Sequence, residues 1–334
     1  MSLTAFVLRR VALAAAVLAV FSSLTFLFFA AKTQPLASHP LLPAYWDWVR
    51  GLFTGSSYHS LIGSGIDGFV PPSLWARVVP ALGRTAALVG AALVLVVVFS
   101  LLVGLAAARW RGAAPDLILR TGTYVAWAVP PFLLGLLVQQ VATTLSDSHG
   151  LGPFPIAGWP GSCPAAIGIN SGTITPCPGA GHGVTFALNV LRYITLPGLT
   201  LALGFIGLHG RYLRSALVEA LDAPFITTAR AKGLSERRVL VRHALRASLA
   251  TFMGVMLSDF GAVFGAALAV DWVFQLQGLG TVFIRLFPTE GFAPIDTYLL
   301  QIMFMLTACF VLAFSLLGEL ATRWFDPRVR AEQT

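Results

Sequence analysis

Residues 211–246 read RYLRSALVEALDAPFITTARAKGLSERRVLVRHALR, a polar and basic segment between two apolar runs that are each long enough to cross a bilayer. Eight of the 22 lysines and arginines of the chain lie in this basic segment: Arg211, Arg214, Arg230, Lys232, Arg237, Arg238, Arg242 and Arg246. Because Lys and Arg concentrate in cytoplasmic loops, we expect the segment to face the cytoplasm. Its ordered pattern exceeds what membrane topology alone requires, and it predicts a docking surface.

The composition is that of an integral membrane protein. The 334 residues are 57% hydrophobic and only 11% charged, whereas soluble domains carry about 25% charged residues. The net charge of +8 is explained by basic cytoplasmic loops. The sequence has no basic groove interleaved with aromatic residues, so nucleic acid is not an expected partner.

The apolar runs predict an all-α fold with about six transmembrane helices. They are Val11–Ala31, Thr85–Ala108, Ile118–Leu145, Leu191–Leu213, Leu249–Phe274 and Tyr298–Thr322. Pro130 and Pro131 predict a kink in the third. The basic residues that flank the spans place both termini in the cytoplasm. We divide the chain into residues 1–84, the first span with an outer segment that includes a surface helix over 43–60, and residues 85–334, a five-helix core that carries the basic segment.

The basic segment itself predicts two short helices separated by a glycine. Asp222 is positioned to cap the first helix, and Pro224 suits its first turn. Helix formers run over Phe225–Lys232, Gly233 ends the helix, and Ser235 is positioned to cap the second. The i, i+3, i+4 spacing predicts one face of the first helix that a partner could approach closely: Phe225, Thr228 and Ala229.

These residues resemble the EAA loop of ABC importer permeases, whose generic form is E-A-A, three residues, G, nine residues, I-x-L-P. Only Ala229, Gly233 and Leu245 match that form. The departures are similar to the dipeptide/oligopeptide branch, in which T-A-R-A-K-G-L-S precedes R-H-A-L-R. Here these motifs are Thr228–Ser235 and Arg242–Arg246.

The resemblance extends along most of the chain. Matching motifs are Leu8-Arg9-Arg10, the outer LGPFPIAGW of Leu151–Trp159, Leu196-Pro197, the stretch from Asp271 to Gly280, and Asp326–Arg330. Gln277 stands where the pattern has proline. The long first outer segment resembles the "B"-type subunit, although the P-G-D-P motif that usually follows the first span is missing from Lys32–Pro43.

The resemblance implies a permease subunit of the type I ABC importer fold in the bacterial cytoplasmic membrane. It would pair with a second homologous permease, two cytoplasmic ATPase subunits and an outer solute-binding protein, and would transport short peptides. Permeases for nickel chelates or haem are similar alternatives. The basic segment would couple to the ATPases through Asp222, Thr228, Ala229, Arg230, Ala231, Lys232, Gly233, Leu234 and Ser235.

The sequence lacks the G-x-x-x-x-G-K-[ST] phosphate loop, H-E-x-x-H and G-x-S-x-G, so no catalytic residue is expected. The chain is expected to bind no cofactor itself, and ATP with Mg would belong to the partner ATPases. Cys163 and Cys177 lie in an outer loop, where they form a disulfide or remain two free thiols. No metal site is expected, because no C-x-x-C spacing occurs.

Polar residues inside the spans are the candidates for the translocation pathway. Asp259 in the fifth span carries an insertion cost of about 2.5–3.5 kcal/mol, so it either faces a water-filled pathway or is paired or protonated. His209 lines the pathway or is a structural hydrogen-bonding residue. Gln139 lines the pathway or forms hydrogen bonds with backbone groups that the prolines leave free. Gly278 and Gly280 belong to a loop that folds back or to an ordinary turn. A different class, an ion-coupled secondary transporter with Asp259 as proton site, stays open at this point.

Overall fold

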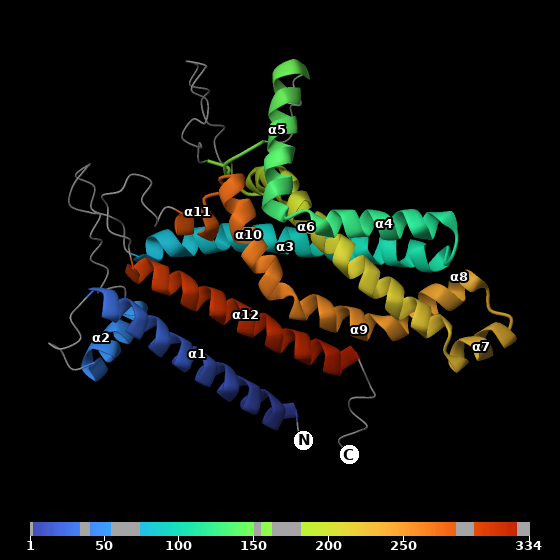
Figure 1. Ribbon diagram of the computed structural model, residues 1–334, viewed down its shortest axis with the longest axis horizontal. Coiled ribbons are helices and arrows are strands. Elements are labelled where there is room, and N and C mark those ends of the chain that lie inside the picture. Colours follow the sequence, from blue (N-terminus) through green and yellow to red (C-terminus); the bar gives the residue numbers. More distant parts are fainter. Residues whose placement is uncertain are drawn as a thin grey trace.

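The computed structural model describes residues 3–33, 41–54, 74–149, 155–161, 182–284 and 297–325, and helices dominate these ranges (Figure 1). Within them, five helices are long and apolar enough to cross a membrane, or six when one sharply bent pair counts as a single span. The predicted all-α fold with about six spans is therefore confirmed. The side of the membrane on which the termini lie stays a prediction. Cys163 and Cys177 lie outside the described residues.

Several helices are longer than the apolar runs that predicted them. In chain order the helices are α1 (Leu3–Thr33), α2 (Leu41–Thr54), α3 (Leu74–Arg109), α4 (Ala114–Ala128), α5 (Pro131–His149), α6 (Val184–Leu221), α7 (Pro224–Ala231), α8 (Glu236–Arg238), the π-helical turn η1 (Val239–Ala244), α9 (Leu245–Ser258), α10 (Phe260–Val273), α11 (Leu279–Ile284) and α12 (Thr297–Phe325). Because α3 begins at Leu74, the predicted division at residues 84 and 85 falls inside a helix. The helix predicted over residues 43–60 is α2 in its described part, and its position at the membrane surface stays a prediction.

The predicted kink at the two prolines is a bend of 95° between α4 and α5. Val129 precedes Pro130 and has an extended backbone (φ −88°, ψ 119°), as expected from the steric clash between a proline ring and a helical residue before it. Pro131 then occupies the first position of α5, where its missing N–H is harmless. Figure 1 shows the result: α4 lies along α3, and α5 projects away from the bundle.

The fifth predicted span, Leu249–Phe274, is wrong as a single helix. It is broken at Asp259, which stands between α9 and α10 with φ −83° and ψ 1°. Upstream, α8, η1 and α9 form one apolar segment, Glu236–Ser258. The predicted second short helix of the basic segment is therefore the beginning of this membrane segment.

The buried side chains form two clusters. The larger lies between α3, α6, α10 and α12, and the smaller joins α6, α7, η1 and α9. Small residues allow close helix contact: a Cβ on Gly207 of α6 would lie 2.5 Å from the carbonyl oxygen of Thr123 in α4. Helix α1 packs against α12, and Arg10 Nε lies 2.6 Å from Glu319 Oε2.

Candidate coupling surface and pathway residues

The start of α7 is fixed by backbone conformation. Ala223 is extended (φ −75°, ψ 148°), and Pro224 is the first helical residue, a position that suits proline. The prediction that Asp222 caps this helix is wrong. Its carboxylate instead accepts two hydrogen bonds from Arg111 Nη1, at 2.9 and 3.0 Å. Asp222 thus ties the end of α6 to the turn between α3 and α4.

The predicted stop at Gly233 is confirmed. Gly233 has φ +75°, in the left-handed region where glycine avoids the clash that an L side chain suffers. Its N–H donates to the carbonyl of Arg230 at 2.9 Å, and the N–H of Leu234 donates to that of Ala229 at 3.4 Å. This pair of bonds is a Schellman motif, which satisfies carbonyls that the helix end leaves free.

The face of α7 that was predicted to meet a partner is only partly exposed. Ile226 and Ala229 are buried, against a cluster that includes Leu213 and Leu217 of α6 and Val239 of η1. Phe225 is 41% exposed, and Thr228 is also exposed. Among the residues predicted to share a face, only Ala229 is buried. Sequence reasoning missed Ile226, although its i, i+3 spacing to Ala229 was a usable signal.

Two ion pairs of different burial support this region. Arg214 on α6 donates to both carboxylate oxygens of Asp116 on α4, at 2.7 and 2.6 Å, and the two side chains are 17% and 3% exposed. Arg230 pairs with Glu236 across the Gly233 turn, at 2.8 and 3.2 Å, but both are solvent-exposed. The hydrogen bond to Glu236 raises the pKa of Arg230 above its usual value.

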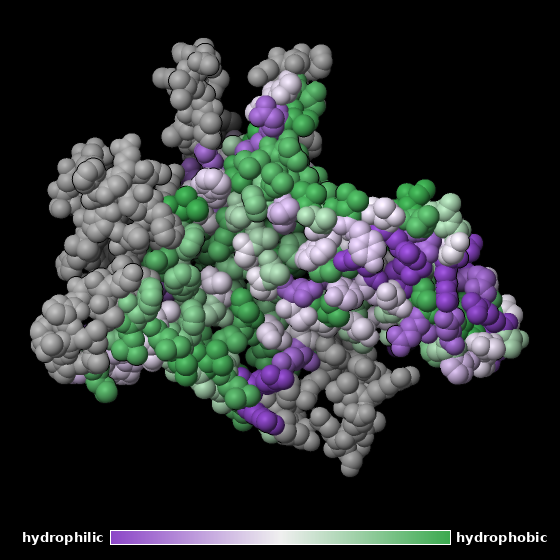
Figure 2. All heavy atoms as spheres, in the orientation of Figure 1, coloured by the Kyte–Doolittle hydropathy of each residue, from purple (hydrophilic) through white to green (hydrophobic). Residues whose placement is uncertain are grey.

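A polar cavity of about 200 Å³ opens between the ends of α3 and α6 and the start of α8. Its charged lining residues are Arg109, Arg111, Asp222, Arg230 and Glu236. Figure 2 shows hydrophilic side chains gathered at this end of the molecule, whereas much of the remaining described surface is hydrophobic. The predicted coupling residues Arg230, Ala231, Lys232, Gly233 and Ser235 are exposed here, while Leu234 is half-buried.

His209 and Asp259, predicted separately, are brought together by the fold. His209 of α6 is fully buried, and its Nε2 lies 3.5 Å from Oδ2 of Asp259 at the α9–α10 break. Its Nδ1 lies 2.9 Å from the carbonyl oxygen of Phe205. The Asp259 side chain remains 32% exposed.

The predicted glycines in the loop after α10 have a structural role. A loop after α10 folds back on Asp271, a fully buried residue whose carboxylate accepts the N–H groups of Gly278 and Thr281, each at 2.9 Å. A Cβ on Gly278 would lie 2.5 Å from Thr85 Oγ1, and one on Gly280 would overlap the Leu268 carbonyl. Sequence position near a span end gave no sign that Asp271 organises this loop.

Gln139, another predicted pathway residue, is used to hold backbone. Its amide donates to the carbonyl oxygens of Ile156 and Val273, at 3.2 and 2.9 Å. These are contacts between α5, the outer loop and α10, not to backbone freed by the prolines. The hydrogen-bond partners of Gln139 therefore differ from the predicted ones, and its pathway role stays a prediction.

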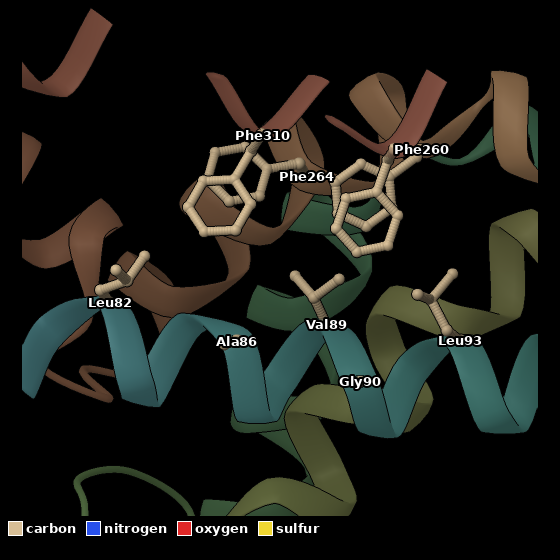
Figure 3. Close-up of a pocket in the computed structure, with 9 residues that line it drawn as sticks. Leu82, Ala86, Val89, Gly90, Leu93, Phe260, Phe264 and Phe310 are labelled. Carbon is tan, nitrogen blue, oxygen red and sulfur yellow. The ribbon is translucent and has the colours of Figure 1, made fainter. Parts of the chain in front are cut away.

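An apolar recess of about 100 Å³ lies between α3, α10 and α12. Figure 3 shows Leu82, Val89 and Leu93 of α3 pointing toward the rings of Phe260, Phe264 and Phe310. Phe260 also stacks on Phe314 of α12, with ring centroids 3.3 Å apart. Phe260, the α10 residue that lines this recess first in the chain, directly follows Asp259.

The family described as binding-protein-dependent transport system inner membrane component matches residues 100–331, which include α4 to α12. The chain belongs to this family. It is a multi-pass component of the bacterial inner membrane and works with other transporter subunits.

Known members of the family are similar to this inner-membrane component over most of its length. The dipeptide transport system permease protein of Lactococcus lactis is 27% identical over 293 residues, which cover 87% of this chain and 81% of the relative. The oligopeptide transport system permease protein of Mycobacterium bovis is 26% identical, with 90% and 84% covered. The glutathione transport system permease protein of Salmonella choleraesuis is 26% identical, with 73% and 67% covered.

Proposed function

We propose that this chain is a permease subunit of an ATP-driven importer for short peptides. Three similar proteins are named for dipeptide, oligopeptide and glutathione transport, and all three names denote short peptides or peptide-like molecules. A second homologous permease completes the translocation pathway, and an outer solute-binding protein delivers the substrate. ATP and Mg belong to two cytoplasmic ATPase subunits, and this chain forms the pathway without catalysing hydrolysis.

The observation that carries the proposal is the two-sided character of α7. One side, with Ile226 and Ala229, is buried against α6, η1 and α9. Phe225 and Thr228 of α7 are exposed, as is Lys232 directly after its end. A partner that binds the exposed residues and displaces α7 therefore also displaces α6 and α9, because packed cores transmit displacement.

Such a connection suits alternating access. Closure of the ATPases on ATP would displace α7 and the ends of α6 and α9 as one body. The two permeases would then rock between an inward-open and an outward-open state, which is a rigid-body two-state change. The buried Asp116–Arg214 pair carries the same motion to α4.

The test is a comparison of Gly233→Pro with Gly233→Asn in the complete importer. Proline fixes φ near −65°, which is incompatible with the observed +75°, and we expect it to abolish ATP-driven dipeptide uptake. Asparagine tolerates the left-handed region and should retain most uptake. Membrane insertion and association with the second permease, measured by co-purification, should be normal for both variants. Unchanged uptake by a well-assembled Gly233→Pro importer would contradict the coupling role.

A reconstitution experiment addresses the substrate and the energy source. Dipeptide uptake into proteoliposomes should require ATP, both permeases, the ATPases and the binding protein. Uptake by this chain alone under a proton gradient would instead make it a secondary transporter.

A further inference from the structure

Four arginines lie exposed on the first turns of the apolar segment that α8, η1 and α9 form. They are Arg237, Arg238, Arg242 and Arg246. The segment, Glu236–Ser258, is one of the helices that are long and apolar enough to cross a membrane. Residues 247–258, which follow Arg246, contain no charged side chain. The four cations therefore stand where the polar start of this membrane helix gives way to its apolar part.

The backbone places three of these arginines on one side of the segment. Arg238, Arg242 and Arg246 follow one another at intervals of four residues, a spacing that makes side chains neighbours on one helix face. Between them η1 is π-helical, and its i→i+5 hydrogen bonds make a wider turn that aligns residues four apart more closely. Val241, an apolar side chain that is 48% exposed, lies between the first two in sequence. We call Arg238, Arg242 and Arg246 the arginine stripe.

No carboxylate in the described part of the chain pairs with the arginine stripe. Glu236 is the one acidic residue among residues 223–258, and it pairs with Arg230. None of the other ion pairs among the described residues includes the stripe or Arg237. Like charges four residues apart repel each other, and cations in the first turn of a helix oppose its dipole. Contact with a negatively charged partner would therefore stabilise this part of the helix.

We propose that the arginine stripe binds the phosphate headgroups of anionic phospholipids. Clusters of Lys and Arg at the end of a membrane helix attract such lipids, and the planar arginine fork matches the oxygens of a phosphate. The Cα–Cβ bonds of a helix tilt toward its N-terminus. Even Arg246, the furthest along the segment, can thus reach back toward the membrane surface with its long side chain. This contact would hold whichever substrate the importer carries.

A lipid fits the arginine stripe better than the acidic surface of a partner protein. The stripe leads directly into the uncharged residues 247–258, and α9 there packs along α12, as Figure 1 shows. The exposed Val241 suits contact with lipid tails at the same depth. The proposed coupling residues Phe225 and Thr228 belong to a different helix, α7. Membrane topology requires positive charge near a span, but it requires no alignment on one exposed face.

The test is native mass spectrometry of the purified complex of both permeases and the ATPases, equilibrated with equal amounts of two lipids. The probes, dioleoylphosphatidylglycerol and dioleoylphosphatidylcholine, have the same acyl chains and differ in headgroup charge. Each arginine near the surface contributes about a fivefold preference for anionic lipid, so the native complex should prefer phosphatidylglycerol by about 10- to 100-fold. Arg242→Gln should lower this preference about fivefold. Changing all three arginines of the stripe to glutamine should remove most of it.

Two control variants separate the stripe from general effects of charge. Arg242→Lys keeps the positive charge at the same position and should retain most of the preference. Arg192→Gln removes an exposed arginine near the start of α6, outside the stripe, and should leave the preference unchanged. Because all of these side chains are exposed, the variants should assemble normally.

Three outcomes would overturn the site. One is equal binding of the two lipids by the native complex. Another is a preference that survives the triple change, and if that variant also loses the ATPases, the stripe docks them instead of lipid. In the third, Arg192→Gln lowers the preference as much as Arg242→Gln does, which would mean that positive charge anywhere on the surface is sufficient.

Discussion

The buried Asp116–Arg214 pair should stabilise the end of the bundle near α7 far more than the exposed Arg111–Asp222 pair beside it. Both pairs have a nitrogen–oxygen distance below 3 Å, at 2.6 and 2.9 Å, but the side chains are 17% and 3% exposed in the first and 50% and 62% in the second. Asp116 also accepts the N–H of Gly112 at 3.1 Å. The perturbations are Asp116→Asn, Arg214→Gln and the double variant, with Arg111→Gln and Asp222→Asn as the matched set.

Removing one partner of a buried pair costs roughly 3–5 kcal/mol, because the other charge is left uncompensated. The residual exposure of Arg214 favours the lower end, so each single variant should lose about 3 kcal/mol, roughly a hundredfold or more in the unfolding equilibrium. The double variant should lose much less than the sum of the singles. For the exposed pair each change should cost about 1 kcal/mol or less.

The assay is unfolding of the purified complex in detergent micelles, followed by tryptophan fluorescence, with the coupling energy taken from each double-mutant cycle. Additive losses at Asp116 and Arg214 would refute the reasoning. Equal coupling energies in the two pairs would do so as well, since burial would then have no effect on the strength of the interaction.

Two other predictions concern the outer loop. Gly280→Ala should prevent stable assembly, because its Cβ would overlap the backbone carbonyl of Leu268. Gly265→Ala, on the exposed side of α10, meets nothing within 4 Å and should stabilise the protein by about 0.5–1 kcal/mol. Thermal midpoints from fluorescence-detected gel filtration compare the two variants, and a normal midpoint for Gly280→Ala would contradict the packing. Gln277 has φ +59°, so Gln277→Pro should destabilise by about 3 kcal/mol although proline is usual in the resembled motif. The stability of Gln277→Gly should stay within about 1 kcal/mol of that of the native chain, since the backbone carbonyl of residue 277 still accepts a hydrogen bond from Arg84. The same gel-filtration assay tests both variants. A tolerated proline would show that residue 277 can adopt the negative φ that proline requires.

Much of the membrane architecture could be predicted from the sequence, because each of its signals is local. Length and hydrophobicity identify spans such as α1 and α12 without knowledge of their neighbours. The bend at Pro130 and Pro131 follows from the geometry of the proline ring. Gly233 ends α7 because left-handed backbone favours glycine at that single position. The Thr228–Ser235 motif indicated the transporter family, and residues 100–331 confirm it.

The errors arose where a residue's role depends on distant neighbours. Asp222 has the chemistry of a helix cap, but the fold brings Arg111 close enough to bind it. The partner-facing side of α7 was predicted correctly for Phe225 and Thr228 but not for Ala229, because α6 and η1 bury Ala229 together with Ile226. Gly278 and Gly280 lie in a loop that folds back, one of the two predicted alternatives, but their small size is required by Asp271 and Leu268, which pack against them.

By itself, the sequence determined the class of the protein, the approximate spans, the helix stop at Gly233 and the position of the basic segment, since hydrophobicity, charge and backbone propensity act over a few residues. Only the tertiary structure decided which side chains meet. His209 and Asp259 are far apart in the chain, and no local pattern links them. They lie 3.5 Å apart because α6 packs against α9 near the point where the fifth span breaks.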